Sequence, residues 1–413
     1  MNYCIKYNTF TKQSFISLLL VFGIIFLSDD CLLFSTNENK IFFYAKFIYI
    51  FAITSIMFIY DLLNQKQFEK KTMSFCFLMI LISFLNIIAT QDFLFGNFCR
   101  ICLFVYSLCL IRRLSINTFF QAYDTIMFFL CIASLVFYLC TFILPDLITS
   151  FPLVTNTANM SYYSIGIYNT RVISDFRNYG FAREPGVFQA FIVIALLYQI
   201  SKGSHLNNKK LFLYTTTLIT TFSTTAFFAL FFCLLVYLFQ SSISKKKKVY
   251  LFVILSLTIC FLAFYLDFLT YLNIRVFNKL ENVNAHTTLS RIASIVVNIY
   301  IFLQHPIFGA GIQNVSEQYS EISQSIMGLY DGSNTNSIFF QFSSQGLFYG
   351  LLWTTPLLLF TRKLFKNKVT IVMSSLILII LCFGENFTYS GLFYLLIFFS
   401  LKSEYSLFVK NGK

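Results

Sequence analysis

The sequence predicts an all-α polytopic membrane protein, because it is strongly apolar and because its apolar runs have the length of membrane spans. Of its 413 residues, 57% are hydrophobic and 11% are charged, and its mean hydropathy is +0.73. This composition excludes an ordinary soluble domain. Apolar runs of about 20 residues, enough to cross a bilayer as one helix, recur along the chain. The net charge of +13 therefore indicates basic cytoplasmic loops rather than nucleic-acid binding.

We expect about 12 transmembrane helices, several of them short, in a single integral membrane domain. No small-residue cleavage site follows the first apolar run, so we expect that run to stay as a span rather than to be removed as a signal peptide. The domain covers residues 1–413, and the predicted spans are residues 14–28, 42–63, 73–90, 97–111, 122–144, 187–200, 211–222, 225–240, 249–268, 338–360, 369–383 and 391–401.

The apolar segment at 211–240 decides this count. It is too long for one crossing, and the sequence TTFSTT interrupts it. Lysines flank it on both sides, and a single crossing would leave one of these basic clusters outside. We therefore expect two short helices that turn near Ser223. With the N-terminus inside, most of the 30 Lys and Arg then lie on the cytoplasmic side.

Two connections on the outer side are long, residues 145–186 and 269–337, and we expect both to fold onto the membrane surface. Within the second, residues 288–304 have a helical pattern. If this helix were a further crossing, the basic residues that follow it would lie on the outer side instead of the cytoplasmic side. We therefore expect an interfacial or re-entrant helix on the outer side.

Three smaller features of the spans are interpreted as structural. Cys99 and Cys102 form a lone CxxC without a second Cys or His pair, so no metal site is expected. Gly346 and Gly350 form a GxxxG pattern, which indicates close helix packing. Asp124 lies near the end of a span and is expected to be solvated at the interface.

Residues 171–189 hold a dense polar cluster that directly precedes an apolar run. Charged side chains beside the bilayer are costly and often mark substrate paths. The cations of the long outer loops are mostly arginines, whose planar guanidinium binds phosphate oxygens bidentately. An anionic lipid headgroup such as a diphosphate is therefore the predicted ligand of these loops. The alternative is that the arginines pair with acids and lipid phosphates and only shape the loops. The arginines concerned are Arg171, Arg177, Arg183, Arg275 and Arg291.

The sequence Arg183-Glu184-Pro185-Gly186 is predicted to open a helix. Proline is tolerated at the first helical position because its missing N–H would be unpaired there, and this places Glu184 at the cap, on the positive end of the helix dipole. An arginine and an acid then lie at the membrane surface in a catalytic or substrate-orienting position. A helix cap with a local ion pair is the alternative.

A set of short motifs follows in a fixed order along the second half of the chain. The REPG turn opens a span, Lys209-Lys210 and TTFSTT form a hairpin, and Arg291 lies upstream of HPIFGAG at residues 305–311. In this order the chain resembles, from about residue 170 to 400, the bacterial Wzy-type O-antigen and capsular polysaccharide repeat-unit polymerases, which belong to the O-antigen polymerase and ligase group. One departure is Thr335-Asn336, where relatives often carry a His-Asn pair, and the missing histidine favours a polymerase over a ligase.

The resemblance implies a membrane glycosyltransferase of the C-type superfamily. Such an enzyme joins oligosaccharide repeat units carried on undecaprenyl diphosphate, at the periplasmic or outer face of the bacterial cytoplasmic (inner) membrane, and needs neither cofactor nor metal. The resemblance places Arg183, Glu184 and Arg291 in or near the active site, with His305 as a further catalytic candidate. Besides the lipid bilayer, the expected protein partners are a chain-length regulator and a flippase.

The implied reaction assigns roles to these residues. Arg183 and Arg291 are expected to stabilise the charge that develops on the departing diphosphate. The acceptor hydroxyl needs a base, and Glu184 and His305 are the candidates. Arg291 and His305 lie roughly 21 Å apart along an ideal helix, so both cannot touch one reacting centre. We therefore prefer Glu184 as the base.

Tyr179, Asn334 and Asn336 are assigned to substrate binding, and the two asparagines are expected to hydrogen-bond to sugars. A polar outer loop without that role would have the same composition. Two other functions stay open. One is an O-antigen ligase, which transfers polymer to lipid A core. The other is a flippase or transporter of lipid-linked oligosaccharides, for which we would expect charges on inward helix faces and repeated halves rather than polar outer loops.

Overall fold

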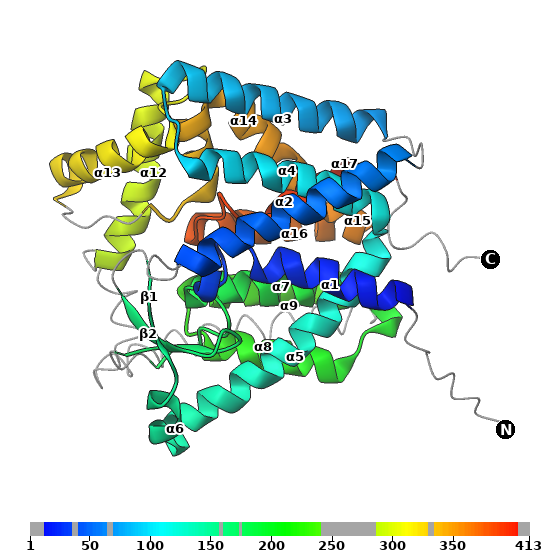
Figure 1. The fold of residues 1–413 in the computed structure, drawn as a ribbon. Coiled ribbons are helices and arrows are strands. Elements are labelled where there is room, and N and C mark those ends of the chain that lie inside the picture. The colour runs from blue at the N-terminus through cyan, green and yellow to red at the C-terminus, as the bar shows by residue number, and fades with distance from the viewer. Residues whose placement is uncertain are drawn as a thin grey trace.

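The computed structural model describes residues 12–34, 40–63, 69–156, 160–172, 176–240, 286–328 and 334–403. These residues form a mainly helical bundle in which several long helices run side by side (Figure 1). The helices at the predicted spans are α1 (Lys12–Phe26), α2 (Lys40–Leu63), α3 (Lys70–Thr90), α4 (Phe95–Arg113), α5 (Ile116–Ile143), α7 (Pro185–Ser201), α8 (Asn208–Thr220), α9 (Thr224–Gln240), α14 (Ser337–Leu359), α16 (Lys368–Gly384) and α17 (Gly391–Leu401).

Each predicted span within the described residues coincides with a helix, and the span predicted at 249–268 lies outside them. The expected turn near Ser223 separates α8 from α9. By length and apolar composition, four described helices are large enough to cross a membrane: Tyr44–Asp61, Lys70–Thr90, Phe95–Arg113 and Ile116–Ile143. Several other apolar helices are shorter. The chain is therefore a helical membrane protein, while 12 crossings remain a prediction.

Two of the short helices are central, which explains why they are apolar on every side. Every residue of α7 is buried, and so are Gly391–Phe399 of α17. A helix that is hydrophobic all round packs inside a protein, whereas an amphipathic helix lies at its edge. These helices therefore contact other helices rather than lipid, and α7, which begins within REPG, runs through the centre of the bundle.

The loops separate into two ends of the bundle, as an alternating topology requires. At one end, which we call the site end, the N–H of Arg183 donates to the carbonyl oxygen of Asp30 at 3.0 Å. At the opposite end, Lys402 Nζ donates to the carbonyl oxygen of Ile111 at 2.6 Å. In Figure 1 the site end is on the left, and the start of α1 and the end of α17 are on the right.

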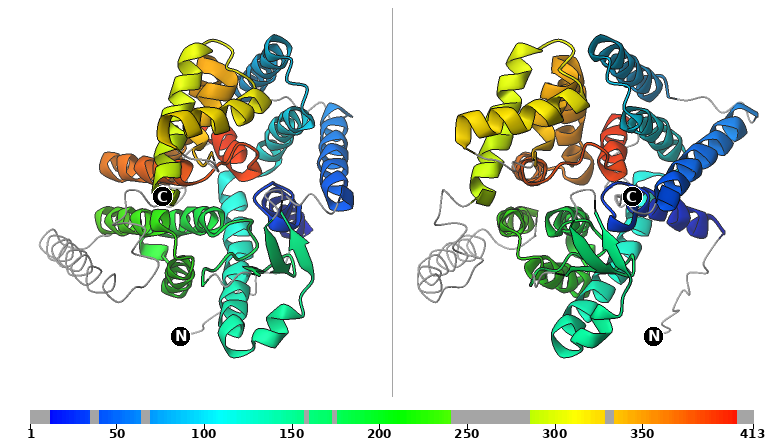
Figure 2. Two further views of the ribbon diagram at one scale, coloured as in Figure 1. Left: turned by 90° about the vertical axis from the view of Figure 1, so that its left-hand side faces the viewer. Right: turned by 60° about the vertical axis from the view of Figure 1, so that its left-hand side comes forward.

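The first long loop contains a small antiparallel sheet at the site end, which the sequence did not indicate. After α6 (Pro145–Thr149), strands β1 (Leu153–Thr155), β2 (Ser161–Ser164) and β3 (Asn169–Arg171) pair in the order β1-β2-β3. Figure 2 shows the sheet beside the helices of the lower half of the bundle. The side-chain Nδ2 of Asn169 donates to the carbonyl oxygen of Ala182 at 3.2 Å, so the sheet holds the chain just before REPG in place.

The second long loop contains α12 (His286–Gln304) and α13 (Ile312–Met327). Helix α12 covers the predicted helix at 288–304. It lies across the site end, at a steep angle to α3, α4 and α7 (Figure 1). Its apolar face packs through Ala293, Val297 and Ile301, which are buried. Its location at a membrane interface stays a prediction.

Helix α14 is broken at Gly346, where φ is 82°. The turn that follows α12 fills the break: the N–H of Ala310 donates to the carbonyl oxygen of Ser343 at 2.8 Å. A Cβ at Gly346 would lie 2.1 Å from the carbonyl oxygen of Ile307. The GxxxG at Gly346 and Gly350 was expected to pack two helices, but Gly346 instead admits this turn. A broken helix is tolerated at membrane depth when protein groups satisfy its free backbone.

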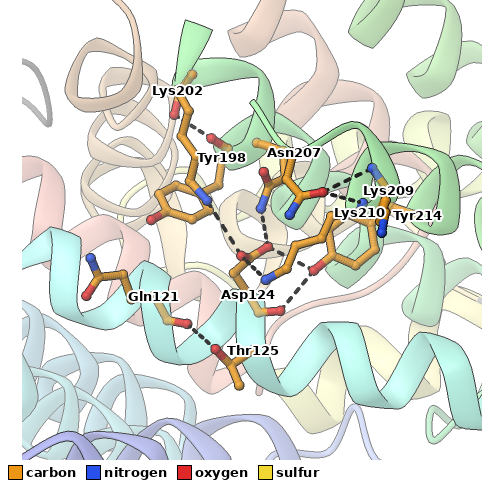
Figure 3. Close-up of polar contacts among 11 residues, drawn as sticks. Gln121, Asp124, Thr125, Tyr198, Lys202, Asn207, Lys209, Lys210 and Tyr214 are labelled. Carbon is orange, nitrogen blue, oxygen red and sulfur yellow. Dashed lines mark hydrogen bonds and ion pairs between the residues drawn. The ribbon is translucent and has the colours of Figure 1, made fainter. Parts of the chain in front are cut away.

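Asp124 is buried rather than solvated at the interface, which corrects the sequence-based expectation. It is 4% exposed and lies at the opposite end from Arg183. Lys210 Nζ lies 2.6 Å and Lys202 Nζ 3.6 Å from its carboxylate, and Tyr214 donates a hydrogen bond to it at 2.8 Å (Figure 3). The two lysines offset the burial of the charge. Asp124 thus ties α5 to α7 and α8.

Replacing Asp124 with Asn is expected to destabilise the bundle by about 1.5–3 kcal/mol, the range for hydrogen bonds to charged groups. Two lysines would then lack their carboxylate. The measurement is the thermal unfolding of the purified, detergent-solubilised variant. The control is Asp146→Asn, since Asp146 is exposed in α6. Equal melting temperatures of the two variants would show that the cluster contributes nothing to stability.

Candidate functional site

Glu184 is the N-cap of α7, as REPG predicted. Its φ and ψ are −145° and 150°, and Pro185 follows as the first helical residue. The N–H groups of Val187 and Phe188 both donate to the carbonyl oxygen of Glu184 at 3.1 Å. The carboxylate itself makes no capping hydrogen bond, and the residue is exposed. The backbone of Glu184 therefore caps the helix while its carboxylate faces outward from the site end.

Arg183 is held between two loops. Its N–H donates to the carbonyl oxygen of Asp30, and its Nη2 donates to the carbonyl oxygen of Asn386 at 2.7 Å. The Nε of Arg183 has no hydrogen-bond partner. Burial raises the pKa of the Asp30 carboxyl, and the charge of Arg183 opposes this shift. The guanidinium is thus held by one backbone oxygen, that of Asn386, and part of its donor capacity is unused.

Glu385 adds a second acid to the site, and it is a residue that the sequence analysis missed. It follows α16 directly and is 7% exposed. A Cβ at Gly186 would lie 1.6 Å from its Oε1, so glycine in REPG leaves the space that this carboxyl occupies. Burial raises the pKa of Glu385 well above its ordinary value, the charge of Glu184 raises it further, and Arg183 and Arg291 oppose the shift. These surroundings therefore favour the protonated, neutral form of the Glu385 carboxyl.

Arg291 reaches the same end of the bundle from α12. Its Nη1 donates to Oγ1 of Thr224, the first residue of α9, at 2.6 Å. One turn further along α12, Ser294 Oγ lies 3.4 Å from Thr335 Oγ1. Among the residues that the structure describes, neither Arg183 nor Arg291 forms an ion pair with a carboxylate. Two guanidinium groups are therefore available to a negatively charged ligand.

The two predicted asparagines lie between α12 and α14. Asn334 and Asn298 exchange amide hydrogen bonds of 2.9 and 3.2 Å. Asn336 caps α14, accepting from the N–H of Phe339 at 2.9 Å, and its Nδ2 has no partner although the residue is fully buried. The next residue, Ser337, hydrogen-bonds to the carbonyl oxygen of Glu385. Asn336 therefore lies beside the Glu385 segment with an unused donor.

The structure does not gather all of the predicted residues. Arg171 ends β3, opposite Tyr162 in the strand register. Arg177 Nη2 donates to Tyr179 Oη at 3.3 Å, and Tyr179 is 2% exposed, with its ring against that of Tyr162. These side chains contact one another within the first long loop and stabilise its fold. Arg275 lies outside the described residues.

His305 lies at the far end of α12 from Arg291. It is exposed, and it lines a cavity of about 440 Å³ together with Thr90, Asn314 and Gln318. The separation along one unbroken helix agrees with the argument that Arg291 and His305 cannot act on one reacting centre. His305 is therefore not part of the cluster around Glu184. No cluster of three metal-ligating side chains occurs in the described part of the chain.

Residues 211–352 match the family model described as O-antigen ligase. The match confirms the resemblance to the O-antigen polymerase and ligase group. This group indicates a membrane glycosyltransferase-like enzyme that acts on lipid-linked oligosaccharides. The matched segment contains Arg291, His305 and Asn336, while Arg183 and Glu385 lie outside it. A search of curated proteins finds no significant match to the chain.

For an enzyme of the O-antigen polymerase and ligase group, this cluster has a suitable chemistry. Arg183 and Arg291 offer hydrogen-bond donors and positive charge to a phosphate group. Glu184 offers an exposed carboxylate within the same cluster. A site of this composition can stabilise an anionic leaving group and accept a proton from a hydroxyl group.

Proposed function

We propose that this protein is a polymerase that joins undecaprenyl-diphosphate-linked oligosaccharide repeat units into O-antigen or capsular polysaccharide, at the outer face of the bacterial inner membrane. The main support is that the charges of Arg183 and Arg291 both act on Glu385, that neither arginine has a carboxylate ion pair among the described residues, and that Glu184 is exposed. Acids do lie near Arg183, and their charges raise its pKa against the effect of burial, but none of the described ones forms a direct ion pair with it.

In the proposed reaction, the acceptor is a sugar hydroxyl of one lipid-linked unit, and the donor is the glycan on a second lipid diphosphate. The acceptor oxygen forms a bond to the anomeric carbon of the donor, and the bond between that carbon and the diphosphate oxygen breaks. Glu184 takes the hydroxyl proton. The electron pair leaves with the diphosphate, whose charge Arg183 and Arg291 stabilise, each by about 3–4 kcal/mol if they act like oxyanion-hole donors.

Thr335-Asn336 favours a polymerase within the group. The resemblance attributes a functional loop histidine to the ligase branch, and this chain has a threonine at that position. The description of the matching family favours the second candidate, an O-antigen ligase that transfers polymer to lipid A core. A flippase is disfavoured because the unpaired guanidinium groups lie at one end of the bundle rather than along its interior.

Surface glycans of a deletion strain distinguish these functions. Loss of the polymerase leaves single repeat units attached to lipid A core, loss of a ligase leaves polymer unattached, and loss of a flippase leaves lipid-linked units inside. The proposal expects the first pattern, restored by the wild-type gene. Purified full-length protein supplied with lipid-linked repeat units is then expected to produce a ladder of lipid-linked polymer without lipid A core. A chain-length regulator and a flippase are not needed for this reaction in vitro.

A further inference from the structure

We propose that Glu385 is a positioning residue, which hydrogen-bonds to the carboxylate of Glu184 and orients it toward the acceptor hydroxyl. This inference rests on the proposed function, in which Glu184 takes the proton. It brings into the site a residue from the segment between α16 and α17, far from REPG in the sequence. It also explains why residue 186 is a glycine, since a side chain there would occupy the space of the Glu385 carboxyl.

The backbone around Glu385 is fixed against α14. Ser337 Oγ donates to the carbonyl oxygen of Glu385 and accepts from the N–H of Phe387 at 2.9 Å. From this backbone the side chain extends to the first turn of α7, where its Oε1 and Cδ would lie 1.6 and 2.5 Å from a Cβ at Gly186. Any side chain at Gly186 would therefore displace the carboxyl. The N-cap Glu184 is only two residues away from this contact.

A hydrogen bond between two carboxyl groups requires that one of them carries a proton, since ionised carboxylates only accept. A side-chain hydrogen bond with Glu184 is among the causes that raise the pKa of Glu385, and Glu385 is the buried member of the pair. Its pKa is raised well above the ordinary value, first by burial and then by the charge of Glu184. The charged groups that face it from other segments are Arg183 and Arg291, which lower its pKa but do not cancel the effect of burial.

The consequence is a division of roles between the two acids. Glu385 stays neutral and donates a hydrogen bond to one oxygen of Glu184. The other oxygen of Glu184 stays free to accept the hydroxyl proton. A fixed base is more effective than a mobile one, because the reacting atoms must meet in a narrow geometry.

Substitutions of Glu385 separate this role from that of an ionised base. Gln has the same shape and still donates a hydrogen bond through its amide, so Glu385→Gln is expected to retain polymerase activity within about threefold. Glu385→Ala is expected to lose about 10- to 100-fold, the effect of removing a hydrogen bond to a charged group. The measurement is ladder formation by the purified full-length protein from lipid-linked repeat units. Membrane abundance and melting temperature are checked for each variant, and Glu321→Gln, on the exposed face of α13, is the control.

Gly186→Ala tests the same contact from the other side. The added methyl group should displace the Glu385 carboxyl and lower activity as much as Glu385→Ala does. Combining both substitutions should then lower activity no further, because the interaction is already lost. Fully additive losses would contradict the proposed contact.

The pH dependence gives a readout that a purely structural role would not change. Because the pKa of Glu385 is raised, its proton is present below that pKa and is lost as the pH rises through it. Wild-type activity should then fall on the alkaline side, since two ionised carboxylates repel each other. Glu385→Gln should remove this fall. The inference is overturned if the profiles of wild type and Glu385→Gln coincide, or if Glu385→Gln is as inactive as Glu385→Ala.

Infrared spectroscopy tests the carboxyl pair without any polymerase assay. The wild-type protein at neutral pH should show a band from a protonated carboxyl group that disappears in the difference spectrum with Glu385→Gln, while the signal of the buried Asp30 stays the same in both proteins. If wild type makes no polymer but shows this band, the proposed function fails and the hydrogen-bonded pair stands. If wild type makes polymer and the band is absent, the role of Glu385 fails and the proposed function stands.

Discussion

Replacing Glu184 with Gln is expected to abolish the long-chain glycan ladder and to leave single repeat units on lipid A core. Gln keeps the size of the side chain but cannot take a proton from the acceptor hydroxyl. General-base catalysis contributes about 10²- to 10⁴-fold, so little polymer should remain. The measurement is surface-glycan length in a strain whose chromosomal copy carries Glu184→Gln. The helix should persist, because its cap bonds come from the carbonyl oxygen of Glu184.

Membrane abundance of Glu184→Gln must equal that of wild type for this result to count. Asp146→Asn, an exposed acid in the same loop, is the matched control and should leave the ladder intact. An intact ladder in Glu184→Gln would mean that REPG is a helix cap with no part in the reaction. Polymer that accumulates unattached would instead indicate the ligase.

The helices were predictable because each depends on a local property of the chain. Apolar runs mark the spans, and the proline of REPG marks the start of α7. The interruption TTFSTT marks the turn between α8 and α9. The arginines at the site end were found by the same local reasoning, because a guanidinium beside an apolar run is unusual whatever the tertiary structure around it.

Glu385 could have been found by that reasoning as well. It is the one acid in the sequence from residue 369 to 403, and it follows an apolar run directly. What the sequence does not contain is its neighbour: the contact with Gly186 joins segments that are far apart in the chain. The same limit applies to Gly346, whose φ of 82° serves a turn from another part of the chain rather than a second helix.

Burial was the property least visible in the sequence. Asp124 and Tyr179 both looked accessible because they lie near span ends or in a polar loop, yet each is buried. Asp124 is stabilised there by Lys202 and Lys210, which were interpreted only as markers of the cytoplasmic side. A charge count assigns such lysines to a membrane face, but it does not show whether they pair with a particular acid.

Arg291→Ala is expected to lower the rate of polymerisation about 10²- to 10³-fold, as the loss of a donor to a developing oxyanion does. Arg291→Lys is the sharper test, because lysine keeps the charge but lacks the planar fork that matches phosphate oxygens. It should recover only part of the loss. The measurement is the rate of ladder formation by purified protein at saturating lipid-linked repeat units.

Arg362→Lys is the matched control, because Arg362 is an exposed arginine at the opposite end of the bundle. It should retain the wild-type rate. Full activity in Arg291→Lys would mean that a point charge suffices and that the fork is not used. Full activity in Arg291→Ala would remove Arg291 from the reaction and leave its hydrogen bond to Thr224 as a contact that only fastens α12 to the bundle. The bond to Thr224 engages one Nη, so the other guanidinium nitrogens are those the diphosphate would use.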